Sequence, residues 1–136
     1  MKPKSQKKNA EKNKIKSPNN SITEIDYPVF CFKHLQITKA KTDFKFYSDF
    51  IERLTKLSNL AWKAINVAHR HGFGTEKIPV DQLKPRLPNF VTPDVTDLTV
   101  FRANGDNRPF LGLRKDNIFH IIFLEEHFGD VYDHSN

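Results

Sequence analysis

The last third of the chain is the most constraining part of the sequence, because it alternates apolar runs with short polar breaks. Residues 98–103 (LTVFRA), 108–114 (RPFLGLR) and 118–124 (IFHIIFL) are rich in β-branched and aromatic side chains. NGDN and KDN separate these runs, and Asn-Gly favours a tight hairpin turn because both residues tolerate positive φ. The pattern predicts three antiparallel strands. Pro109 lacks an amide hydrogen, so we expect it at a strand start or an unpaired edge position.

Residues 118–124 are apolar at both sets of alternating positions, and His120 is the one exception. A strand with one solvated face would alternate apolar and polar side chains. This strand is therefore either central and covered on both faces, or closed on one face by another chain.

The preceding residues predict one strand, two helices and a loop. Residues 27–35 (YPVFCFKHL) read as a strand, and residues 44–57 have apolar side chains at helical spacing after a cap at Thr42 or Asp43. Ser58 predicts the cap of a second helix that reaches Ala68. Prolines at 79, 85, 88 and 93 predict a loop-rich crossing over residues 78–95. The order predicts an α+β fold, with the two helices packed on a small antiparallel sheet that includes a C-terminal three-stranded meander.

The basic character of the chain is concentrated at its N-terminus. The chain has 22 basic and 16 acidic residues, and residues 1–21 contain seven Lys and one Glu, so 15 of each remain. Residues 1–21 contain one large apolar side chain, Ile15, and are predicted to form a disordered basic tail. Residues 22–136 are predicted to form a single domain. The tail is expected either to attract nucleic acid or an anionic surface, or to act as a solubilising linker.

Several classes of protein are excluded by what the sequence lacks. A single cysteine, Cys31, permits no intrachain disulfide and no thiolate metal cluster. No secretory signal pattern and no apolar run of membrane-spanning length is present, so the expected location is the cytoplasm and no membrane contact is expected. P-loop, Rossmann, nucleophile-elbow and HExxH patterns are also missing, which argues against a nucleotide-dependent enzyme or a zinc protease.

The chain resembles the RelE/ParE/HigB superfamily of toxins from bacterial toxin–antitoxin systems, both in its element order and in the sequence FRANGDNRPFLGLRKDNIFHIIFLEEHFGDVYDH. The resemblance covers residues 27–134, whereas the Pro-rich crossing and the basic tail are additions. It implies an endoribonuclease that cleaves mRNA, free or on the ribosome, without metal or other cofactor. It also implies neutralisation by a cognate antitoxin. Some members of the superfamily instead inhibit gyrase, and the fold does not decide between these targets.

Metal-independent RNA cleavage needs proton transfer and a cation for the phosphate, and the C-terminal third contains suitable side chains. We expect Arg114 and Arg102 to bind the phosphate, because a guanidinium donates two parallel hydrogen bonds. His134 is the expected general acid or base. Tyr132 would stack on a base or share the proton transfer. The alternative is that each arginine is a solvated charge at a strand end.

A second group of basic residues, with Arg108, is a candidate for binding the RNA backbone. It comprises His69, Arg70, His71 and Lys77 at the end of the predicted helices. The alternative is a set of cations that suits the C-terminus of a helix. His69 and His71 do not suggest a metal pair, because side chains two residues apart on a helix diverge. A non-catalytic RNA- or protein-binding module on the same fold is the competing function.

Overall fold

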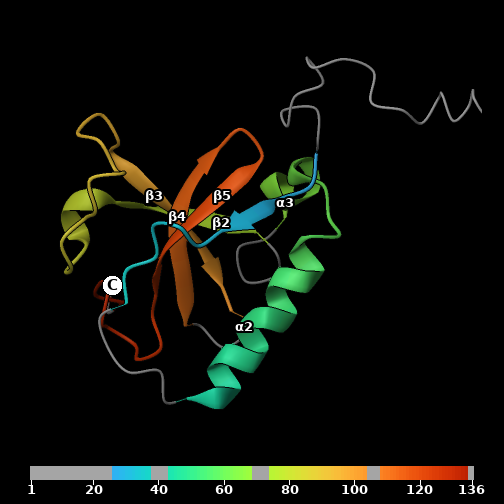
Figure 1. The fold of residues 1–136 in the computed structure, drawn as a ribbon, viewed down its shortest axis with the longest axis horizontal. Coiled ribbons are helices and arrows are strands. Elements are labelled where there is room, and N and C mark those ends of the chain that lie inside the picture. The colour runs from blue at the N-terminus through green and yellow to red at the C-terminus, as the bar shows by residue number, and fades with distance from the viewer. Residues whose placement is uncertain (1–25, 38–42, 69–73, 104–107, 135–136) are drawn as a thin grey trace, which may run out of the picture.

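The computed structural model describes residues 26–37, 43–68, 74–103 and 108–134. These residues form a mixed α+β fold around a five-stranded sheet with the strand order β1-β5-β4-β3-β2. The two α-helices lie on one side of this sheet (Figure 1). The elements in chain order are β1 Val29–Cys31, α2 Phe44–Leu57, α3 Trp62–Val67, β2 Thr75–Pro79, the short 3-10 helix η2 Val80–Gln82, β3 Asp97–Arg102, β4 Pro109–Lys115 and β5 Ile118–Leu124.

Helix α2 is confirmed at its predicted bounds. The side chain of Asp43 caps it by accepting a hydrogen bond from the Phe46 amide at 3.0 Å. The predicted cap at Ser58 is wrong, because Ser58 ends α2 and its hydroxyl donates to the Leu54 carbonyl at 2.8 Å. Helix α3 begins later, at Trp62, after Ala61, which has no side chain that can cap.

The predicted meander is confirmed within the described residues. Strands β3, β4 and β5 pair antiparallel in sequence order, and Pro109 is the first residue of β4. Asp116 takes a φ of 58° in the turn between β4 and β5, a backbone conformation that Asp tolerates better than most residues. The NGDN turn falls on residues 104–107, outside the described part of the chain.

Two features of the sheet differ from the prediction. The sheet is mixed rather than antiparallel, because β1 pairs in parallel with β5, with Val29 opposite Ile118. Strand β1 also has three residues, far fewer than residues 27–35. Strand β2 was not predicted, since Glu76 and Lys77 interrupt any apolar alternation, and it forms the other edge of the sheet by pairing antiparallel with β3.

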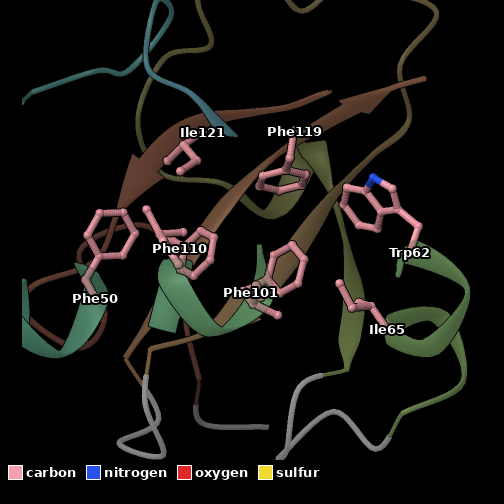
Figure 2. Packing of buried hydrophobic residues seen from close by; sticks show 9 residues of the cluster. Phe50, Trp62, Ile65, Phe101, Phe110, Phe119 and Ile121 are labelled. Carbon is pink, nitrogen blue, oxygen red and sulfur yellow. The ribbon is translucent and has the colours of Figure 1, made fainter. Parts of the chain in front are cut away.

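Each face of the sheet is covered by its own apolar cluster. The first cluster joins helices α2 and α3 to the sheet (Figure 2) and contains Phe50, Leu54, Leu57, Trp62, Ile65, Phe101, Phe110, Phe119 and Ile121. The second cluster lies on the opposite face and contains Ile78, Val91, Leu98, Val100, Leu111, Ile122, Phe123, Val131 and Tyr132, with partly buried side chains from the Pro-rich crossing packed against it.

The second cluster explains why residues 118–124 are apolar on both faces. Strand β5 lies between β1 and β4, so it is central. Residues of the Pro-rich crossing and the C-terminal segment cover the face that the helices leave open (Figure 1). The cover therefore comes from the same chain. Within the described residues, no helix has the length and apolar character needed to cross a lipid bilayer.

Candidate active site

A polar pocket of about 330 Å³ lies where the C-terminal segment meets the edge of the sheet. Residues of β2, the end of β3 and the C-terminal segment form its walls, together with Gln82 of η2. The lining residues are Glu76, Lys77, Ile78, Gln82, Arg102, Tyr132, Asp133 and His134. Three of the four residues expected to be catalytic, Arg102, Tyr132 and His134, therefore share one pocket.

Arg102 and Glu76 form an ion pair in this pocket. Glu76 lies opposite Val100 in the β2–β3 register. Residues directly opposite each other on paired strands share a face of the sheet, and so do residues two apart on one strand. Glu76, Val100 and Arg102 therefore lie on the same face. The pair places a guanidinium and a carboxylate side by side, and both are partly exposed to solvent.

Lys77 borders the pocket, but its place in the register separates it from Arg102. It lies opposite Thr99, whose neighbours Leu98 and Val100 belong to the second cluster. Strand alternation therefore directs Lys77 to the opposite face of the sheet from Glu76. Arg102 is thus the better-placed cation for a ligand in the pocket.

Tyr132 is buried in the wall of the pocket, with 8% of its surface exposed. Burial raises the pKa of its hydroxyl above the ordinary value of 10.0, while the positive charge of Arg102 acts in the opposite direction. Within the described residues, the hydroxyl makes no hydrogen bond of ordinary geometry. Tyr132 therefore stays protonated near neutral pH and has a hydrogen to donate.

The imidazole of His134 makes three close contacts. Its Nε2 lies 2.5 Å from Oε1 of Glu125, a residue with no exposed surface. The rings of Phe128 and Tyr132 have centroids 4.0 Å from the imidazole centroid, at interplanar angles of 18° and 31°. These contacts make the C-terminal segment part of the pocket wall.

Arg114 lies elsewhere on the sheet and cannot share a phosphate with Arg102. Arg102 pairs with Pro109, and Arg114 lies five residues further along β4, which is roughly 16 Å at about 3.3 Å per residue. The guanidinium carbon of Arg114 lies 4.1 Å from the centroid of the Trp62 ring, on the helix-covered face. The expected pair of phosphate-binding arginines is therefore separated in the structure.

Arg108 joins helix α2 to the sheet. Its guanidinium donates to the side chain of Asp43 at 2.7 Å and to the Glu126 carbonyl at 3.0 Å, and it lies over the Phe46 ring. Next to it, the Tyr47 hydroxyl donates to Glu126 at 3.1 Å. Burial, followed by this hydrogen bond, raises the pKa of Tyr47 to about 12. Arg108 thus lies outside the polar pocket, in contacts that hold the fold together.

The other sequence candidates fall outside the pocket. His69, Arg70 and His71 lie outside the described residues. The buried Nδ1 of His120, on β5, has no hydrogen-bond partner in the described part of the chain. In that same part, no group of three or more His, Cys, Asp or Glu side chains could hold a metal ion.

Glu125 is a pocket-supporting residue that the sequence analysis did not single out. A charged side chain directly after an apolar strand normally indicates the solvated end of that strand. A signal was nevertheless present, because Tyr132 and His134 follow Glu125 closely enough in the sequence to fold back onto it. Gln82 was missed because it lies in a segment predicted to be a loop.

Comparison with known proteins finds no relative of the chain. No protein-family model, curated protein or solved structure matches the chain. The resemblance to the RelE/ParE/HigB superfamily therefore stays a prediction from the sequence.

Proposed function

We propose that the protein is a metal-independent endoribonuclease of the RelE-like toxin type, with its active site in the polar pocket. The observation that carries the proposal is the convergence of Arg102, Tyr132 and His134. These residues come from a strand and from the C-terminal segment, and they supply a cation, a protonated hydroxyl and an imidazole within one pocket.

The proposed reaction uses the 2′-hydroxyl of the RNA as the nucleophile. A base takes the hydroxyl proton while its oxygen bonds to phosphorus, the bond to the 5′-oxygen breaks, and an acid protonates that oxygen. His134 serves as general acid or base, and Glu76 is a further carboxylate of the pocket that can exchange a proton. Arg102 stabilises the negative charge on the phosphorane, and Tyr132 donates a hydrogen bond to it. The products are a 2′,3′-cyclic phosphate and a 5′-hydroxyl.

A protein partner that neutralises the activity is part of the same proposal. Large apolar side chains are exposed on helix α2 and beside β1, namely Phe44 at 86%, Ile51 at 56%, Tyr27 at 50% and Phe32 at 46%. A groove of about 410 Å³ runs between β1 and α2. Exposed apolar surface of this kind suits a protein interface.

A non-catalytic binding module is the second candidate, and the ion pairs favour it. Arg102 and Arg108 each contact a carboxylate, Glu76 and Asp43 respectively. These contacts weaken the positive field that would attract a phosphate backbone. Under this alternative the protein would bind RNA or protein and leave RNA intact.

Cleavage of defined RNA by the full-length protein separates the two candidates. We expect a single-stranded RNA, or an mRNA in a translating extract, to be cut in the presence of EDTA, and an all-deoxy oligonucleotide to stay intact. Arg102→Ala and His134→Asn should each lower the rate by about a hundredfold or more. Exposed Arg86→Ala and His127→Asn are the matched controls and should keep the wild-type rate.

The same variants can be tested by induced expression in a bacterial host. Growth arrest by wild type that is relieved by His134→Asn supports the toxin proposal. Binding without cleavage in every condition would favour the binding module. Growth arrest together with intact RNA would point to another target, such as gyrase.

A further inference from the structure

Glu125 is a completely buried carboxylate, and the structure gives it a full set of partners. One carboxylate oxygen, Oε2, accepts hydrogen bonds from the backbone amides of Val131 at 2.7 Å and Tyr132 at 3.3 Å. The other, Oε1, faces Nε2 of His134 at 2.5 Å. A buried charge is costly unless its hydrogen bonds are satisfied, so this arrangement favours an ionised Glu125 whose two oxygens are both acceptors.

An ionised Glu125 determines which ring nitrogen of His134 carries the hydrogen. Because a carboxylate can only accept, the Nε2 facing it must be protonated. Neutral imidazole has one ring hydrogen, so Nδ1 is left with its lone pair. The stacked rings of Phe128 and Tyr132 limit rotation of the imidazole about the Cβ–Cγ bond, so the two nitrogens cannot easily exchange places.

We infer that Glu125 is a positioning residue that fixes the Nε2–H tautomer of His134 and thereby makes Nδ1 the nitrogen that exchanges a proton with the substrate. This inference rests on the proposed function, because it assigns the working atom of the same pocket. As a base, Nδ1 accepts a proton. As an acid, it gives one up and returns to the tautomer that Glu125 stabilises. Either role depends on the same contact.

The same carboxylate also fixes the backbone of the pocket wall. Its bonds to the Val131 and Tyr132 amides place Tyr132, which also packs against His134. One side chain therefore sets the position of Tyr132 and the protonation pattern of His134. A purely structural role would require only the backbone contacts, so the tautomer separates the two explanations.

The substitution Glu125→Gln tests the inference with little change in shape. The amide oxygen can still accept from Val131, while the amide nitrogen, which can only donate, then faces His134. His134 must accept that hydrogen at Nε2 and move its own hydrogen to Nδ1. We expect ¹⁵N NMR of the neutral imidazole to show the Nε2–H form in wild type and the Nδ1–H form in Glu125→Gln. Glu126→Gln is the matched control, since Glu126 is also buried and contacts Tyr47 instead.

Steady-state kinetics of RNA cleavage then test the consequence for catalysis. We expect Glu125→Gln to lower kcat by about a hundredfold while KM changes by less than about twofold, because proton transfer is affected and substrate binding is not. Glu126→Gln should keep the wild-type kcat. An unchanged kcat in Glu125→Gln, in a protein whose tautomer has reversed, would overturn the positioning role.

The NMR measurement keeps this inference separate from the proposed function. An Nδ1–H tautomer in wild type overturns the inference directly, even if Glu125→Gln does not fold. Absence of RNA cleavage by wild type in every condition overturns the proposed function. In that case, the wild-type tautomer still decides whether Glu125 controls His134.

Discussion

Gly112 of β4 lies directly against the backbone of His120 on β5. A β-carbon on Gly112 would lie 2.0 Å from the His120 carbonyl oxygen and 2.9 Å from the Phe119 ring. The close approach accompanies an irregularity in the β4–β5 ladder, where Leu111 pairs with Phe123 and Gly112 pairs with Ile121. The extra residue, Ile122, shifts the alternation of β5, and this shift lets Ile122 and Phe123 both join the second cluster.

Gly112→Ala should therefore destabilise the fold strongly. The added methyl group would overlap backbone atoms that cannot rotate away, so we expect a loss of about 3 kcal/mol in the free energy of unfolding. Gly129→Ala is the informative comparison, because Gly129 has a φ of 92° but no atom within 4 Å of an added β-carbon. That variant should lose about 1 kcal/mol from backbone strain alone. Urea unfolding measures both, and equal losses would contradict the steric explanation.

His120 should make the stability of the fold fall in mild acid. Burial lowers the pKa of its imidazole below the ordinary value of 6.5, and the positive charges of His34 and Lys115 lower it further. The unfolded chain therefore binds the proton at higher pH than the folded chain. The contribution of neutral His120 to the free energy of unfolding is fully present above pH 6.5, and it is lost as the pH falls through the pKa of the folded state.

The measurement is a series of urea unfolding curves between about pH 7.5 and about pH 5. His120→Asn should flatten this part of the pH profile because it removes the titrating group. His127→Asn, at an exposed position, should leave the profile as in wild type. An unchanged slope in His120→Asn would assign the acid sensitivity to another group.

Asp43 is expected to stabilise the fold in two separable ways. It caps α2 by accepting from the Phe46 amide, and it pairs with Arg108. Asp43→Asn keeps an acceptor for the cap but loses the charge, whereas Asp43→Ala loses both. We expect the Tm to decrease in the order wild type, Asp43→Asn, Asp43→Ala.

The same pair gives a second acid transition, well below that of His120. The hydrogen bond from Arg108, followed by that from Phe46, holds the pKa of the Asp43 carboxyl below 3.8. The stabilisation is therefore present above pH 3.8 and disappears as the pH falls through the folded pKa. Thermal unfolding of wild type and Asp43→Asn should converge in that range. A constant difference in Tm between the two proteins would contradict the expectation.

Tyr132→Phe should separate chemistry from packing. The ring fills the second cluster and stacks on His134, while the hydroxyl has no hydrogen-bond partner of ordinary geometry in the described residues. Removing the hydroxyl should change the free energy of unfolding by no more than about 0.5 kcal/mol. RNA cleavage should nevertheless slow, because the phosphorane loses a hydrogen-bond donor. A wild-type rate would remove the hydroxyl from the proposed mechanism.

Arg114→Ala tests the separation of the two strand arginines. Since its guanidinium lies over Trp62, far along β4 from the pocket, we expect RNA cleavage within about twofold of wild type. The chain has one tryptophan, so its fluorescence emission should shift when the guanidinium is removed. A loss of cleavage as large as that of Arg102→Ala would restore the original assignment of both arginines to one phosphate.

Local sequence patterns predicted the parts of the fold that depend on neighbouring side chains. Neighbouring side chains predicted the bounds of α2, the position of Pro109 and the strand at residues 118–124, and they limited the cap of α2 to Thr42 or Asp43. The parallel pairing of Val29 with Ile118 has no local signal, because it joins opposite ends of the described chain. The polar strand β2 has no apolar alternation and was missed for that reason.

The candidate site was predictable in its residue types but not in its arrangement. Tyr132 and His134 were expected to return to the strand arginines, and the structure brings them to Arg102. Whether Arg114 shared that face depended on strand alternation and register, which a sequence does not fix. Glu125 was overlooked because buried carboxylates are rare and its partners lie on a backbone turn that only the folded chain reveals.

The pairing of β1 with β5 also sets an order of assembly during synthesis. The first strand of the described chain has no partner until the last strand has emerged from the ribosome, because Val29 pairs with Ile118. Contacts of such long sequence separation form slowly. One edge of the sheet therefore forms late, because β1 can pair only once residues 118–124 are available.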